Sequence, residues 1–136
     1  MANSDNVIRA GLTPKLRDVP NLVSGLTYIA SPPSKHVVMA QTFMSSTCSL
    51  LYDPPIPEFS VVQVVLSSKD EESRECHRAV DGPSLAIVTD GNGVVSWGID
   101  SKLSIGRGEV FFVGAGVRVQ FESEGRLTLY RAFVEA

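Results

Sequence analysis

The stretch LSIGRGEVFFVGAG, residues 103–116, shows the sequence pattern that recurs through most of this chain. An apolar run ends at a glycine, a second apolar run follows Gly108 and Glu109, and three small residues, 114–116, come after it. Glycine permits tight chain reversals because it adopts backbone conformations that other residues avoid. The stretch therefore predicts two short strands separated and followed by turns.

The same pattern continues on both sides of this stretch, from Pro57 to the end of the chain. Short runs rich in Val, Ile, Phe and Tyr alternate with clusters of Gly, Asp and Ser, which is typical of strands joined by turns. The expected strands are 59–67, 84–89, 93–98, 109–113, 117–122 and 127–134. Many short strands without helical periodicity between them predict a mainly β fold, either a sandwich or a barrel.

The tetrapeptide Asp90-Gly91-Asn92-Gly93 lies between two of these runs. Tight hairpin turns require positive φ angles, which Gly and Asn tolerate. The tetrapeptide therefore predicts a hairpin over residues 87–95.

The first third of the chain has a different pattern. Apolar residues recur with helical spacing from Val19 to Leu26, Asp18 precedes them as a candidate N-cap, and Pro20 is tolerated in a first turn. A short helix over 19–27 is expected.

Two proline-rich segments, 31–34 and 52–57, bracket the region that follows this helix. Proline is excluded from central strands, so both segments are interpreted as extended surface connections. The residues between them, 35–51, are expected to run irregularly.

The composition indicates one soluble globular unit, with 43% hydrophobic and 20% charged residues in 136. The formal charge of −3 and the scattered Lys and Arg residues argue against a nucleic-acid partner. The apolar runs fall short of the roughly 20 residues that a membrane helix needs, so no membrane span is expected. The polar start of the chain, 1–6, has no signal-peptide character, which favours the cytoplasm.

The cysteines and histidines do not form a recognisable metal motif. Cys48 and Cys76 stand far apart and are expected to be reduced. His36 and His77 are each isolated in polar surroundings, whereas a metal site needs several converging ligands. His77, beside Cys76, is interpreted as a loop residue next to an acidic run. No metal ligand is therefore predicted.

The residues most suggestive of chemistry lie in SDNVIRAGLTPK, residues 4–15. In an extended strand Asp5 and Arg9 share a face, and the turn at Pro14 allows Lys15 to swing back toward them. One carboxylate and two cations could then gather against an anionic substrate, since Arg binds phosphate or an enediolate through two donors. The alternative interpretation is an ordinary surface ion pair.

The same string, continued by RDV at 17–19 and later by YDPPIPEF at 52–59, resembles type I mannose-6-phosphate isomerases. The resemblance covers essentially the whole chain, as the C-terminal portion of that family. It implies a cupin-type jelly-roll β-barrel and interconversion of mannose 6-phosphate and fructose 6-phosphate through a cis-enediol, with zinc as the metal. It also implies that Arg9 is the active-site arginine, that Asp5 lines the catalytic pocket and that Lys15 lies near the sugar phosphate.

The family's zinc ligands, a glutamine, two histidines and a glutamate, precede the SDN string in that family and have no counterpart here. The resemblance therefore implies zinc in the full-length family but none bound to this chain alone, and the chain alone is expected to be inactive. A fragment, a truncated gene model and a splice product are equally compatible with the sequence.

The resemblance also implies a division into domains. Residues 1–35 are expected to provide the active-site strand, turn and short helix of the preceding barrel region, and residues 36–136 a C-terminal cupin-like jelly-roll domain with a packed interior. The full-length enzyme is expected to be a cytoplasmic monomer in carbohydrate metabolism that feeds GDP-mannose synthesis. The alternative function is a non-catalytic cupin-like module that binds a small anion or a partner protein.

Overall fold

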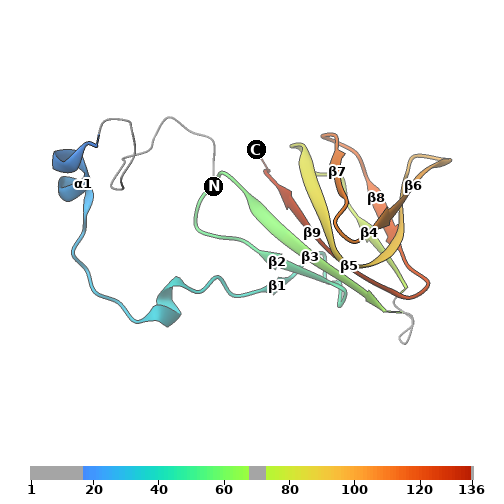
Figure 1. The fold of residues 1–136 in the computed structure, drawn as a ribbon, viewed down its shortest axis with the longest axis horizontal. Coiled ribbons are helices and arrows are strands. Elements are labelled where there is room, and N and C mark those ends of the chain that lie inside the picture. Colours follow the sequence, from blue (N-terminus) through green and yellow to red (C-terminus); the bar gives the residue numbers. More distant parts are fainter. Residues whose placement is uncertain (1–16, 68–72, 136) are drawn as a thin grey trace. The chain divides into compact units, whose positions relative to one another are not determined.

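The computed structural model describes residues 17–67 and 73–135, and contacts divide the chain into two units, 1–37 and 38–136. The described part of the first unit contains helix α1 (Val19–Gly25) and the 3-10 helix η1 (Pro33–His36) (Figure 1). The Asp18 side chain caps α1, because Oδ1 accepts a hydrogen bond from the Asn21 backbone N–H at 3.2 Å. The predicted short helix is confirmed and ends at Gly25.

The described part of the second unit is built from strands. They are β1 (Gln41–Thr42), β2 (Ser49–Tyr52), β3 (Ser60–Ser67), β4 (Arg74–His77), β5 (Ser84–Trp97), β6 (Ser101–Gly106), β7 (Val110–Val113), β8 (Val119–Glu122) and β9 (Arg126–Phe133). The predicted mainly β fold with one short helix near the N-terminus is confirmed, and the expected strands in 59–67, 109–113, 117–122 and 127–134 are present.

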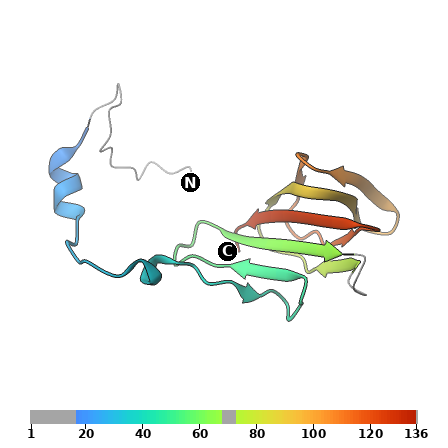
Figure 2. The same cartoon turned by 60° about the horizontal axis from the view of Figure 1, so that its bottom comes forward.

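Strand β5 organises the second unit because it belongs to two layers. Its first half pairs with β9 and β7, and its second half pairs with β6 and β8. One layer therefore has the strand order β1-β2-β3-β9-β5-β7 and the other the order β6-β5-β8-β4, with every neighbouring pair antiparallel. Sharing β5 makes the sheet curl back on itself (Figure 1), and β2, β3 and β9 run side by side in the larger layer (Figure 2).

The predicted hairpin over 87–95 is wrong, because β5 runs straight through the DGNG tetrapeptide. The register with β9 shifts between Val88 and Asp90, which is where the strand passes from one layer to the other. Gly91 has φ +74, and a Cβ on it would lie 1.7 Å from the Arg126 carbonyl oxygen. The glycine is needed for close backbone approach at a bulge, and the true turn into β6 lies at Gly98, where φ is +63.

The interpretation of 35–51 as irregular is also wrong, since this segment contains β1 and most of β2. Ser49 lies opposite Val64 and Tyr52 opposite Val61, so the long strand β3 provides the pairing that holds β2 in place. Four residues are too few to show a period in the sequence. Tertiary pairing, rather than local pattern, forms these strands.

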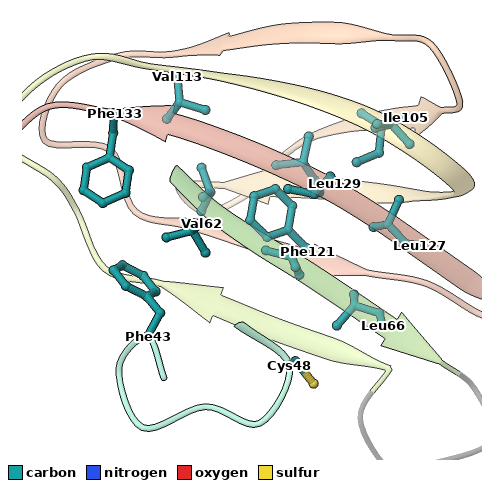
Figure 3. Close-up of a cluster of buried hydrophobic side chains, with 14 of the residues drawn as sticks. Phe43, Cys48, Val62, Leu66, Ile105, Val113, Phe121, Leu127, Leu129 and Phe133 are labelled. Atoms are coloured by element: carbon teal, nitrogen blue, oxygen red, sulfur yellow. The ribbon is translucent and has the colours of Figure 1, made fainter. Parts of the chain in front are cut away.

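The core lies between the two layers and is formed by inward-facing residues of alternating parity. Val62, Val64 and Leu66 of β3 are fully buried, and so are Leu127 and Leu129 of β9. Figure 3 shows Val62, Leu66, Leu127 and Leu129 gathered with Phe121 and Phe133 in one cluster. The space between the two described layers is therefore a packed core.

Candidate functional site

The residues singled out from the sequence for catalysis and substrate binding, Asp5, Arg9 and Lys15, lie outside the described residues. Their mutual placement stays a prediction. The structure instead reveals a polar cluster inside the second unit, which sequence reasoning did not find.

The cluster gathers polar side chains on the inner face of four strands. Ser49 of β2, His77 of β4, Ser84 of β5 and Arg131 of β9 are each at most 3% exposed. The Glu75 side chain, also on β4, lies at the border of this group and is 11% exposed. Buried polar groups of this kind persist when they satisfy one another by hydrogen bonds.

A chain of hydrogen bonds runs through the cluster. The Ser49 hydroxyl donates to Glu75 Oε1 at 2.7 Å, so the Ser49 oxygen accepts from His77 Nε2 at 3.0 Å. His77 Nδ1 then accepts from Arg131 Nη1 at 3.4 Å. These contacts assign His77 as a neutral ring with its proton on Nε2.

His77 is held neutral by its surroundings. Burial and then the nearby charge of Arg131 lower the pKa of His77 to about 3. The rings of Phe43 and Phe121 lie edge-on to the imidazole, with centroid distances of 5.0 and 5.2 Å. The apolar rings on two sides and the guanidinium on another disfavour a second proton on the imidazole.

Arg131 is the most unusual member of the cluster because it is a buried cation. Its Nε donates to the Ser84 hydroxyl at 2.9 Å, whereas Nη2 has no partner within the described part of the chain. Burial, followed by the charge of Arg78, lowers the pKa of Arg131 below its usual value. Its two polar partners, Ser84 and His77, come from β5 and β4, so Arg131 links three strands in the interior.

The interpretation of His77 as a loop residue in polar surroundings is wrong. Arg74, Glu75 and Arg78 flank it in sequence, but His77 ends a strand and projects inward while exposed neighbours project outward. The sequence did contain a signal that Arg131 is buried. Leu127, Leu129 and Phe133 have the same parity as Arg131 in the predicted strand, so alternation alone places Arg131 in the core.

A zinc ion does not fit this cluster. The ring nitrogens of His77 are both engaged, one of them with a guanidinium that would repel a cation. Within residues 17–67 and 73–135, no group of three or more His, Cys, Asp or Glu side chains is arranged to hold a metal. The cluster can orient and stabilise the barrel interior, and its buried groups cannot reach a substrate.

Two surface features complete the description of this unit. Just after β4, Arg78 forms a two-point ion pair with Glu135, and its guanidinium lies 5.8 Å from the centre of the Phe43 ring. On the smaller layer, a groove of about 840 Å³ is lined by Lys102, Arg107 and Glu124 among others. The groove mixes both signs of charge and does not define one ligand chemistry.

No helix in the described ranges is long and apolar enough to cross a membrane.

Sequence comparison relates this chain to one enzyme family. Residues 49–99 match the family model for the phosphomannose isomerase type I C-terminal region. The mannose-6-phosphate isomerase of Cryptococcus neoformans is 51% identical over 100% of this chain and 31% of its own length. That of Saccharomyces cerevisiae is 45% identical over 99% of the chain and 32% of its length. The chain thus spans about a third of these relatives.

Solved structures agree with the sequence comparison. The mannose 6-phosphate isomerase of Salmonella typhimurium, bound to its substrate fructose 6-phosphate and to zinc, matches with a TM-score of 0.76 and 27% identity, over 100% of this chain and 32% of that one. The cupin-type fold of that enzyme is therefore the fold of this chain. The chain belongs to the type I mannose-6-phosphate isomerase family and corresponds to its C-terminal portion.

Proposed function

We propose that this chain is the C-terminal part of a zinc-dependent mannose-6-phosphate isomerase, which interconverts mannose 6-phosphate and fructose 6-phosphate. The observation that carries the proposal is the 51% identity to the Cryptococcus enzyme along the whole chain, which includes the SDNVIRAGLTPK string. The substrate class is supported by the Salmonella relative, which holds fructose 6-phosphate.

Within this proposal Arg9 stabilises negative charge on the enediolate that forms as a proton moves between the two carbons next to the carbonyl. A guanidinium suits this role because it stays charged and donates two parallel hydrogen bonds. Asp5 lines the same pocket, and Lys15 attracts the phosphate as a point charge. Zinc, when bound in the whole enzyme, would polarise the sugar carbonyl, and no residue of the described barrel is assigned to hold it.

The proposal also includes the setting of the enzyme. We place it in the cytoplasm as a monomer that supplies mannose phosphate for GDP-mannose synthesis, with its C-terminal domain a jelly roll. Residues 1–35 contribute to the catalytic barrel, and residues 36–136 form the second barrel. The supporting observations are the family membership and the absence of a membrane-spanning helix in the described part.

A chimera tests the proposed function. In the Cryptococcus enzyme, the region that matches this chain is replaced by the chain itself, and fructose 6-phosphate formation is followed in a coupled assay with zinc present. The chimera is expected to turn over mannose 6-phosphate, whereas the 136-residue chain alone is expected to show no turnover with or without zinc. Arg9→Ala in the chimera should lower kcat by about 10²-fold without changing the melting temperature.

The outcomes separate the two candidate functions. An inactive but folded chimera, or an Arg9→Ala chimera with undiminished turnover, would overturn the catalytic assignment. The former result would favour the alternative, a non-catalytic cupin-like binding module.

A further inference from the structure

The proline-rich segment 31–34 contains a serine that the proposed function does not use. Proline follows Ser or Thr at two places in the chain, Thr13-Pro14 and Ser31-Pro32, and the second pair lies within the described residues. Ser31 stands between α1 and η1 and is half-buried, whereas residues 32–42 are all exposed. An exposed connection outside the strand layers can enter the cleft of another enzyme without unfolding the domain.

The segment around Ser31 is held in shape by hydrogen bonds of its own. Ser31 Oγ lies 2.7 Å from His36 Nε2, and the Lys35 N–H donates to the Pro32 carbonyl oxygen at 3.0 Å. Pro32 has an extended backbone, with φ −63 and ψ 149, and the residue before a proline is itself restricted to extended conformations. The Ser31 hydroxyl is therefore carried on an extended Ser-Pro step, and a cation and an imidazole follow within five residues.

We propose that Ser31 is a phosphorylation site for a protein kinase that selects proline after the acceptor residue. Proline has no backbone N–H, so a kinase pocket without an acceptor at that position admits proline and disfavours residues whose amide would stay unpaired. In the transfer, Ser31 Oγ forms a bond to the γ-phosphorus of ATP, and the bond from that phosphorus to the β–γ bridging oxygen breaks. ADP leaves, and the hydroxyl proton passes to the catalytic carboxylate of the kinase.

The residues that follow Ser31 suit the phosphorylated product. Phosphoserine carries a charge of about −2 at pH 7 and has three strong acceptor oxygens. The His36 ring, already in contact with Ser31 Oγ, can donate to one of these oxygens, and Lys35 supplies a positive charge beside it. The phosphate thus closes the segment 31–36 more firmly than the present neutral hydrogen bond does.

The test treats the purified 136-residue chain and the Cryptococcus chimera with ATP, Mg²⁺ and a purified mitogen-activated protein kinase, which selects Ser-Pro and Thr-Pro. Mass spectrometry locates the phosphate, because Ser31 falls in the tryptic peptide 18–35 and Thr13 in 10–15, and fragment spectra separate Ser31 from Ser34. Ser31 should be phosphorylated in both proteins. Ser31→Ala should remove this phosphate, the matched control Ser34→Ala should retain it, and Pro32→Ala should lower the rate by about tenfold.

Three results would overturn the proposal: no phosphate at Ser31, an undiminished rate in Pro32→Ala, or modification of the 136-residue chain but not of the chimera. The last result would mean that the remaining two-thirds of the family's chain cover Ser31. The readout is a mass and not turnover, so the proposal stands or falls independently of the proposed function.

Trypsin cleavage after Lys35 tests whether the phosphate closes the segment. The phosphorylated chain should be cut there about threefold or more slowly than the unmodified chain, because closure lowers the population of open, cleavable conformations. The ratio of the two rates should return toward one in His36→Ala. Equal rates for the phosphorylated and unmodified wild type would overturn the assignment of His36 and Lys35 as partners of the phosphate.

Discussion

At the scale of single residues, the neutral His77 makes the domain sensitive to acid. The folded-state pKa is about 3, far below the ordinary value of 6.5, so the unfolded chain binds the extra proton first. The contribution of His77 to stability is therefore fully present above pH 6.5 and is lost as the pH falls toward 3. Over that window the free energy of unfolding should decline by up to about 1.4 kcal/mol per pH unit from this group.

The matched variant is His77→Gln, whose amide can donate to Ser49 and accept from Arg131 but does not titrate. Chemical denaturation at several pH values should give a flatter pH dependence for the variant than for the wild type. If the free energy of unfolding has the same slope against pH in both proteins between pH 6 and pH 4, the folded state does not lower the pKa of His77.

The polar cluster also shows which site residues could be read from the sequence. Arg131 could be placed in the core, because it shares the parity of buried leucines in a strand eight residues long. His77 could not, because β4 has only four residues and its partners Ser49 and Arg131 lie 28 and 54 positions away. Long-range contacts, which no local pattern encodes, define this cluster.

At the scale of elements, the two glycines near the centre and end of β5 have opposite tolerance for a side chain. Gly91→Ala would push a methyl group into the Arg126 carbonyl and should cost at least about 3 kcal/mol of the free energy of unfolding. Gly98→Ala also has a positive φ but meets nothing within 4 Å, so it should cost only about 1 kcal/mol. Denaturant titrations of the wild type and the two variants measure these losses in the free energy of unfolding.

Similar losses in both variants would mean that backbone strain alone, and not the close approach to β9, determines the requirement for glycine.

The position of Gly91 in a bulge also explains why the hairpin prediction failed. A turn and a bulge both require positive φ from the same residue types, so the DGNG tetrapeptide cannot distinguish them. The strands on either side were predicted correctly, because alternation and composition are local properties.

At the scale of the whole domain, shared strand β5 predicts that both layers unfold together. Trp97, the single tryptophan, ends β5 in the smaller layer, whereas Leu66 is fully buried in β3 of the larger layer. Leu66→Ala should therefore shift the Trp97 fluorescence transition and the far-UV circular dichroism transition equally, with a loss of about 3 kcal/mol. Fluorescence that unfolds at the wild-type midpoint while circular dichroism shifts would reveal independent layers.

The uninterrupted course of β5 also determines where the polypeptide can be engineered. A protease site, an epitope or a split-reporter junction placed at DGNG, which looks from its sequence like a permissive loop, would sever the one element common to both layers. The turn around Ile99 accepts foreign residues far more readily, since its side chain is almost wholly exposed. Insertion there would leave the registers of β5 and β6 intact up to Trp97 and Ser101.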